Sequence, residues 1–172
     1  MANPILQVYL SHAPDGPEWA LDGVVDILRR LQGTRGKPYE LRYGYTGGRT
    51  VEAPLPIGRP PAPAGAVTLA DADLVFVLVT RAYFKSAYVS EVERPLLEER
   101  LADEGYAGVF PILVEPEAYA YSWLEAHQPR TIILGATAAA GADSRALYGV
   151  EQWLTAAEKI SERLLGLAAV RR

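Results

Sequence analysis

The stretch DADLVFVLVTRAYFKSAYVSEVERPLLEERL, from Asp71 to Leu101, decides the fold. Leu74 to Val79 is a continuous apolar run that is too short for a helix, so it predicts a strand buried on both faces. A helix is expected from about Val89 to Glu104. Its apolar face consists of four residues at helical spacing: Val92, Leu96, Leu97 and Leu101. Between the two lies an aromatic and polar loop, Thr80 to Ser90, where a parallel sheet presents a ligand site.

Strands and helices are expected to alternate on both sides of this stretch. Short apolar runs predict four further strands, at Ile5–Leu10, Tyr39–Tyr43, Val109–Val114 and Thr131–Leu134. Apolar residues at helical spacing predict a helix that ends near Gly33 and a last helix. Six residues share one face of that last helix: Val150, Trp153, Leu154, Ala157, Ile160 and Leu164. The segment 44–65 is a long Pro- and Gly-rich loop, and a loop of this length in a compact domain is usually functional or mobile.

Alternating strands and helices predict an α/β fold. We expect a flavodoxin-like three-layer sandwich, with a five-stranded parallel sheet of order 2-1-3-4-5 and helices on both faces. A single domain spans residues 1–172, with a core of about 5–168. In that strand order the ligand crevice lies at the carboxyl ends of the first and third strands. The loops that reach it are Ser11–Asp15 and Thr80–Ser90.

The composition narrows the classes of partner. The chain has 172 residues, of which 49% are apolar and 22% are charged. A net charge of −4 and a pI near 5.3 argue against a nucleic acid or an anionic membrane bound through charge alone. The lack of cysteine excludes a disulfide framework, a thiolate zinc site and a cysteine nucleophile. Because we find no signal peptide and no apolar run approaching about 20 residues, we expect a cytoplasmic protein without a membrane partner.

Three segments carry a family resemblance. They are VYLSHAPD (8–15), ADLVFVLVTRAYFKSAYVSEVERPLLEE (72–99) and GVFPILVEPEAY (108–119). They are similar, in order, to an opening strand with a Ser-His-x-x-Asp loop, a central strand followed by Phe-x-x-Ser-x-Tyr and a helical Glu, and a fourth strand with Pro-Ile and a trailing Pro. This pattern resembles a TIR (Toll/interleukin-1 receptor) domain of the bacterial type. The resemblance covers nearly the whole chain, but the segment 44–65 departs from the family's acidic, Gly-containing pattern after the second strand.

The resemblance implies a choice between two functions. Many TIR domains cleave NAD+ at the nicotinamide–ribose bond, and others act only as self-associating scaffolds. For this chain the first would mean an NAD+ glycohydrolase that releases nicotinamide and ADP-ribose or a cyclic ADP-ribose product. NAD+ would be its substrate, and no cofactor or metal is expected. The resemblance further implies self-association with other TIR domains and a role in bacterial immune signalling or antiphage defence.

The resemblance also implies where the site lies. The family's catalytic Glu falls on Glu93 of this chain, with Glu91 as its nearby competitor, and Tyr88 takes the aromatic position that packs by the substrate. One carboxylate is enough for this chemistry, because the bond breaks with oxocarbenium character and nicotinamide leaves as a neutral molecule. The competing interpretation is structural, since Ser90-Glu91-Val92-Glu93 is also a Ser-x-x-Glu capping box.

Three further residues are candidates for substrate binding. Ser11 would offer a hydroxyl, His12 would contact a phosphate or a substrate hydroxyl beside Glu93, and Arg49 would pair with phosphates. Each has an ordinary structural alternative. Such a serine more often closes a turn, the histidine caps its loop or faces solvent, and a loop arginine is solvated.

Two other functions stay open. A non-catalytic interaction module, working through homotypic contacts, is favoured by the Pro-rich segment 44–65 and by the capping interpretation of Glu93. A nucleoside deoxyribosyltransferase-like enzyme shares the fold type and the use of one Glu at a ribosyl carbon. The chain has no Gly-x-Gly-x-x-Gly after its first strand, no P-loop and no Gly-x-Ser-x-Gly elbow, which excludes the classes that depend on them.

Overall fold

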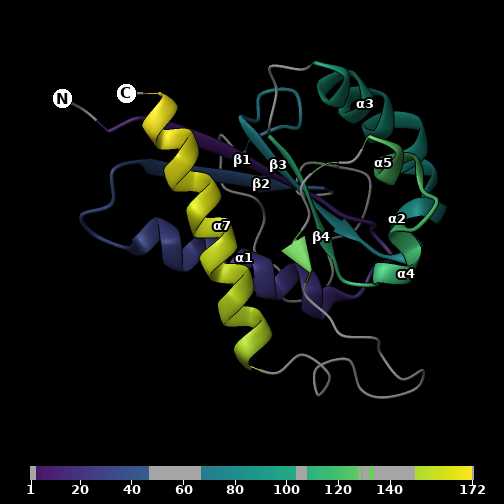
Figure 1. The fold of residues 1–172 in the computed structure, drawn as a ribbon, viewed down its shortest axis with the longest axis horizontal. Helices are drawn as coiled ribbons and strands as arrows, with labels where there is room; N and C mark the ends of the chain where they lie inside the picture. Colours follow the sequence, from purple (N-terminus) through teal and green to yellow (C-terminus); the bar gives the residue numbers. More distant parts are fainter. Residues whose placement is uncertain are drawn as a thin grey trace.

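The computed structural model describes residues 3–46, 67–103, 108–127, 129, 132–133 and 150–171, with side chains for all of these except 132–133 and 150–152. Strands and helices alternate along the chain (Figure 1). The strands are β1 (Ile5–Ser11), β2 (Glu40–Tyr45), β3 (Leu74–Val79), β4 (Val109–Leu113) and β5 (Ile132–Ile133). The helices are α1 (Glu18–Gly33), α2 (Arg81–Lys85), η1 (Val89–Glu93), α3 (Arg94–Ala102), α4 (Pro116–Tyr119), α5 (Trp123–Ala126) and α7 (Val150–Val170).

The strands pair in parallel in the order β2-β1-β3-β4-β5. Four of them, of five to seven residues, make up most of this sheet. The remaining strand, β5, is only two residues long and pairs with the end of β4. The predicted α/β class with a parallel sheet is therefore confirmed. Of the fifth strand predicted at Thr131–Leu134, the structure describes Ile132–Ile133, which form β5; the ends of the predicted range lie outside the described residues.

The central strand β3 is buried along its whole length, as its apolar run predicts. Its side chains alternate between two hydrophobic clusters, because successive residues of a strand point to opposite faces. Leu74, Phe76 and Leu78 join a cluster that includes α1 and α7. Val75, Val77 and Val79 join one that includes α2 and α3. Figure 1 accordingly shows α1 and α7 on one side of the sheet and α2 to α5 on the other.

The helices α1 and α7 pack against each other over the first cluster. Gly23 of α1 lies against the indole of Trp153, and a Cβ built on Gly23 would come within 2.1 Å of that ring. The predicted inner face of α7 is correct at Ile160 and Leu164 but wrong at Leu154, which is exposed. Among the α7 residues whose side chains are described, 153–170, the buried positions are Ala156, Ile160, Leu164 and Ala168.

The helix after β3 contains a π-helical segment, η1, that runs into α3. Pro95 follows this segment, and proline both lacks an N–H and clashes with the carbonyl four residues before it, so the wider π-turn relieves a conflict with α-helical geometry. The backbone N–H of Arg94 donates to the carbonyl of Val89, five residues earlier.

The inner face of this helix differs from the predicted one. The buried positions are Val89, Glu93 and Leu97, four residues apart. Val92 and Leu96, predicted to face the core, are 46% and 38% exposed. A carboxylate therefore occupies the middle of the buried face.

The polar connection after β4 contains two short helices. Ser122 caps α5, because its side chain accepts a hydrogen bond from the backbone N–H of Glu125. This confirms the short helix predicted at Ser122–Ala126. None of the helices in the described ranges is long and apolar enough to cross a bilayer.

Candidate functional site

The carboxylate of Glu93 lies at the end of η1 and is only 1% exposed. It faces the carboxyl end of β1, next to the residue that follows β2. Three hydroxyl groups surround it. The Tyr9 hydroxyl is 2.9 Å and Thr46 Oγ1 is 2.8 Å from Glu93 Oε1, and Ser11 Oγ is 2.5 Å from Oε2. Ser11, predicted to offer its hydroxyl to a substrate, directs that hydroxyl at Glu93 in this structure, and its contact with a substrate stays a prediction.

All three hydroxyls donate to the carboxylate, and their other contacts hold them in that role. The backbone N–H of His12 donates to Thr46 Oγ1 over 3.0 Å. The Tyr83 hydroxyl lies 2.9 Å from Ser11 Oγ. Because the single proton of Ser11 is directed at Glu93, Tyr83 is the donor in that pair. The site is therefore a hydrogen-bond network in which oriented O–H groups converge on one carboxylate.

The strands bring these groups together through register. Tyr9 and Ser11 are two residues apart on β1, so they point to the same face of the sheet. Gly44 of β2 pairs with Tyr9, and the backbone N–H of Thr46 donates to Leu10, which extends the pairing past the strand end. Parallel pairing thus sets the Thr46 hydroxyl beside the Tyr9 hydroxyl, 3.4 Å away.

Burial raises the pKa of Glu93 above its ordinary value, because a charged carboxylate is disfavoured away from water. The hydrogen bonds from Ser11, Thr46 and Tyr9 oppose this effect without cancelling it. Burial and the nearby charge of Glu93 raise the pKa of Tyr9 and of Tyr83 far above the usual range, so both phenols stay protonated. The site keeps its donors while holding a carboxylate that protonates more readily than an exposed one.

We predict that the native protein loses stability relative to a Glu93→Gln variant as the pH rises. A raised pKa in the folded state means that this proton is held more tightly than in the unfolded chain. Its stabilising contribution is complete below the ordinary value of 4.5 and is lost as the pH passes through the raised value. Urea unfolding of both proteins from about pH 4 to about pH 8 measures the difference. If the native protein instead gained stability relative to Glu93→Gln as the pH rose, the hydroxyls would be lowering the pKa of Glu93.

His12 is buried, and its ring contacts backbone carbonyls. Nδ1 lies 2.9 Å from the carbonyl of Ala13, and Nε2 lies 2.9 Å from that of Thr46. A neutral imidazole can donate to only one of these oxygens. These contacts tie the loop after β1 to the residue after β2, so His12 helps to place Thr46 beside Glu93. Its predicted contact with a substrate stays a prediction.

The two remaining predicted residues have different outcomes. Tyr88, one turn before Glu93, is partly exposed, and burial followed by the charge of Glu93 raises its pKa. It therefore lies close enough to sense the carboxylate. Arg49 falls outside the described residues, as does most of the predicted loop 44–65, whose first residues, Gly44 to Thr46, end β2 and follow it.

The capping interpretation of Glu93 is wrong. No side-chain capping bond is present at the start of α3, and the Ser90 N–H donates to the backbone carbonyl of Ser86. The hydroxyl of Ser86 accepts from the Val89 N–H, so the cap lies four residues before Ser90. The carboxylate of Glu93 is thereby available for its contacts with the strands.

Sequence reasoning missed Tyr9, Thr46 and Tyr83 as members of the site. Tyr9 and Tyr83 resemble ordinary core aromatics, and only their hydroxyl groups connect them to the site, through Glu93 and Ser11. Thr46 carried a usable signal, because a polar residue directly after the second strand lies next to the crevice of a 2-1-3 sheet. In the described part of the chain, no three His, Asp or Glu side chains gather as metal ligands would.

Comparison of the chain with protein-family models, with curated proteins and with solved structures found no match in any of the three. The function therefore has to be argued from the Glu93 site itself. The arrangement can present one carboxylate, with a set of hydroxyl donors, to an electron-deficient centre in a largely desolvated environment.

Proposed function

We propose that this chain is a TIR-like domain that cleaves NAD+ at the nicotinamide–ribose bond, with Glu93 as the catalytic carboxylate. The observation that carries the proposal is the buried carboxylate of Glu93, held by three hydroxyls at the carboxyl ends of β1 and β2. A structural ion would be expected to have a cationic partner, since buried charges are usually paired. Within the described part of the chain, the hydrogen bonds of the Glu93 carboxylate are all to neutral hydroxyls.

The reaction needs no second acid. The C1′–N bond breaks, its electron pair goes to the positively charged nicotinamide ring, and neutral nicotinamide leaves. The carboxylate of Glu93 stabilises the cationic ribose that remains, and the low polarity of the site strengthens this attraction. Water then adds at C1′ and releases a proton, giving ADP-ribose, or a ring nitrogen of adenine adds and gives a cyclic product.

Access to the carboxylate requires an exchange of hydrogen bonds. All three hydroxyl contacts leave Glu93 enclosed, so a ribose hydroxyl has to replace at least one of them. Ser11 and Thr46 are the smaller donors; Ser11 is the last residue of β1 and Thr46 directly follows β2. This exchange agrees with the self-association that the resemblance implies, because packing between copies can supply the free energy for it. We further propose the flavodoxin-like three-layer arrangement, a cytoplasmic location and a role in bacterial immune signalling.

The test is nicotinamide release from NAD+ by the native protein at high concentration, with and without a crowding agent. We expect release that rises more steeply than in proportion to protein concentration. Free nucleosides serve as parallel substrates. Base release from nucleosides but not from NAD+ would point to the deoxyribosyltransferase-like chemistry instead.

A non-catalytic interaction module is the second candidate, and a specific observation favours it. Tyr88, directly before η1, Val92 of η1 and Leu96 of α3 follow one another at intervals of four residues, and all three are at least one-third exposed. An exposed apolar row on a helix suits a contact with another chain. No release of nicotinamide under any of these conditions, together with concentration-dependent assembly, would support this function.

A further inference from the structure

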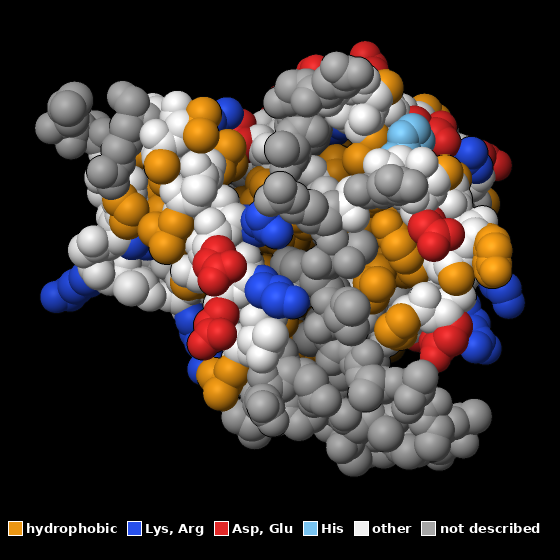
Figure 2. All heavy atoms as spheres, viewed as in Figure 1, with side chains coloured by type: hydrophobic (Ala, Val, Ile, Leu, Met, Phe, Trp, Pro, Cys, Tyr) orange, Lys and Arg blue, Asp and Glu red, His pale blue; other side chains and the backbone are white. Residues whose placement is uncertain are grey.

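A cavity of about 260 Å³ lies on the other flank of the helix that carries Glu93. One wall comes from α2, η1 and the first residue of α3, and the opposite wall from α4, α5 and the residues between them. Figure 2 shows hydrophobic side chains gathered on the surface between α4 and α5, beside acidic ones. The cavity is separate from the Glu93 site, and nothing in the proposed function uses it.

Arg94 gives this cavity a positively charged group with free donors. Its Nε donates to Glu98 over 2.9 Å, and its guanidinium lies 5.3 Å from the centre of the Trp123 ring. Within the described part of the chain, its two terminal amino groups make no hydrogen bond or ion pair. Four N–H donors are thus left on a guanidinium whose plane is held by a carboxylate and an aromatic ring.

The aromatic walls are firmly placed. Phe84 packs edge-on against Trp123, with ring centres 6.4 Å apart and an interplanar angle of 84°. Phe84 also packs edge-on against the fully buried Tyr83. A flat ring entering the cavity would meet surfaces that do not have to rearrange, which reduces the entropic cost of binding.

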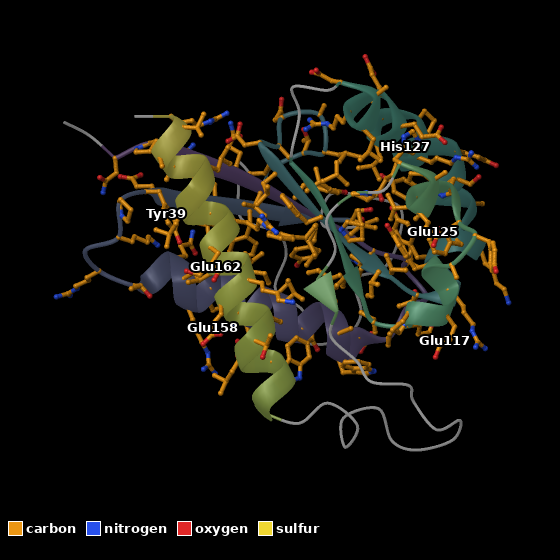
Figure 3. The ribbon with its side chains drawn as sticks, viewed as in Figure 1. Tyr39, Glu117, Glu125, His127, Glu158 and Glu162 are labelled. Atoms are coloured by element: carbon orange, nitrogen blue, oxygen red, sulfur yellow. The ribbon has the colours of Figure 1, made fainter. Side chains whose placement is uncertain are left out.

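Tyr121 adds an aromatic side chain at the rim. Its backbone has a φ of 62°, a left-handed conformation that is strained for a residue other than glycine. Its N–H donates to the carboxylate of Glu125, which Figure 3 labels on α5, and its side chain is fully exposed. The strained backbone holds a large apolar side chain in water beside the cavity, where it gains contacts only if something binds.

We propose that this cavity binds a small aromatic anion, whose ring packs against Trp123 and Tyr121 and whose carboxylate or phosphate pairs with Arg94. Ser90 also lines the cavity, and a serine hydroxyl can donate to such an anion. The volume is below the roughly 300–1,000 Å³ of sites for drug-sized ligands, so the occupant is one ring system with its anionic group. Glu98 holds the guanidinium through Nε and leaves the bidentate edge to the ligand.

The test follows the indole N–H signal of Trp123 in ¹⁵N–¹H spectra, assigned by its loss in Trp123→Phe. The probes are two matched pairs, nicotinate with nicotinamide and AMP with adenosine, each pair differing in an anionic group. We expect the anion of at least one pair to shift this signal with a Kd of about 1 mM or tighter, and its neutral partner to bind at least about 10-fold more weakly. The responding pair shows whether a carboxylate or a phosphate is bound.

Arg94→Gln should weaken binding of the responding anion by about 10- to 100-fold. Arg30→Gln is the matched control, because Arg30 is an exposed, ion-paired arginine on α1. This variant should bind the responding anion as tightly as the native protein does. Retention of the dispersed amide spectrum shows that each variant is folded. Equal binding of neutral and anionic partners, unchanged binding by folded Arg94→Gln, or no shift with any probe would overturn the proposal.

Discussion

Glu93→Gln is expected to reduce the rate of nicotinamide release from NAD+ by at least about 100-fold, the range found when a charge-stabilising group is removed from an active site. The physical reason is that an amide carries no negative charge to stabilise the cationic ribose. The measurement is initial-rate release at saturating NAD+, at the protein concentration where the native protein is active. A retained rate would remove Glu93 from the chemistry.

This substitution is chosen because the site can accommodate an amide without unfolding. The amide oxygen can accept from Tyr9 and Thr46, as Oε1 of the carboxylate does. The amide N–H can donate to Ser11 Oγ, but one O–H of the Ser11–Tyr83 pair then loses its acceptor, because the single contact between the two oxygens uses only one proton. The melting temperature should therefore fall only slightly below that of the native protein. Glu93→Ala is a poorer test, since it leaves three buried hydroxyls without their acceptor.

Glu91→Gln is the matched control. Glu91 lies two residues earlier on the same segment and is exposed. The Glu91→Gln substitution changes the net charge by the same amount but alters nothing in the buried site. The rate of nicotinamide release should therefore stay within about two-fold of the native rate, as expected for a surface substitution of small energetic effect. If both variants lost activity equally, the effect would be one of charge and not of the Glu93 site.

Gly44→Ala is expected to lower the free energy of unfolding by about 3 kcal/mol, at the upper end of the cost of overpacking a core. A Cβ on Gly44 would lie 2.0 Å from the backbone carbonyl oxygen of Val67. The obstacle is backbone, and β2 is itself fixed by its pairing with β1, so neither side can move aside at low cost. Urea unfolding at neutral pH measures the change.

Gly166→Ala provides the control for the Gly44 experiment. Gly166 lies inside α7, and a Cβ there would have no neighbour within 4 Å. Alanine in a helix interior stabilises by about 0.5–1 kcal/mol relative to glycine, so the free energy of unfolding should rise. The Gly44 variant should also lose activity, because Thr46 is two residues away and displacement of β2 would take its hydroxyl from Glu93. Similar effects of both substitutions would contradict the steric explanation.

The two predictions concern the same physical arrangement. Glu93 is enclosed in part because the end of β2 places the Thr46 hydroxyl against its carboxylate. This position of β2 requires glycine at residue 44, since the backbone of Val67 occupies the space that a side chain would need. Stability and the proposed catalysis therefore share one strand end.

Sequence reasoning named Glu93 without its environment. Strand order pointed to the loops after the first and third strands, and the family resemblance singled out Glu93 within that region, while Ser11 was predicted from the loop after the first strand. The helix phase around Glu93 was predicted wrongly, with Val92 and Leu96 inward. Helical spacing assumes a regular α-helix and an apolar inner face, whereas η1 is π-helical before Pro95 and its inner face contains a carboxylate.

The sequence by itself determined the central strand, the alternation of strands with helices and the order in which the strands pair. These depend on local apolar runs and on general rules of chain connection, which a single chain displays directly. Only the tertiary structure decided that Tyr9, Thr46 and Tyr83 belong to the site, and that Arg94 and Trp123 enclose a second cavity. Such contacts join residues from 29 positions apart, for Arg94 and Trp123, to 84, for Tyr9 and Glu93. They depend on strand register and helix phase, in which a shift of one residue turns a side chain to the other face.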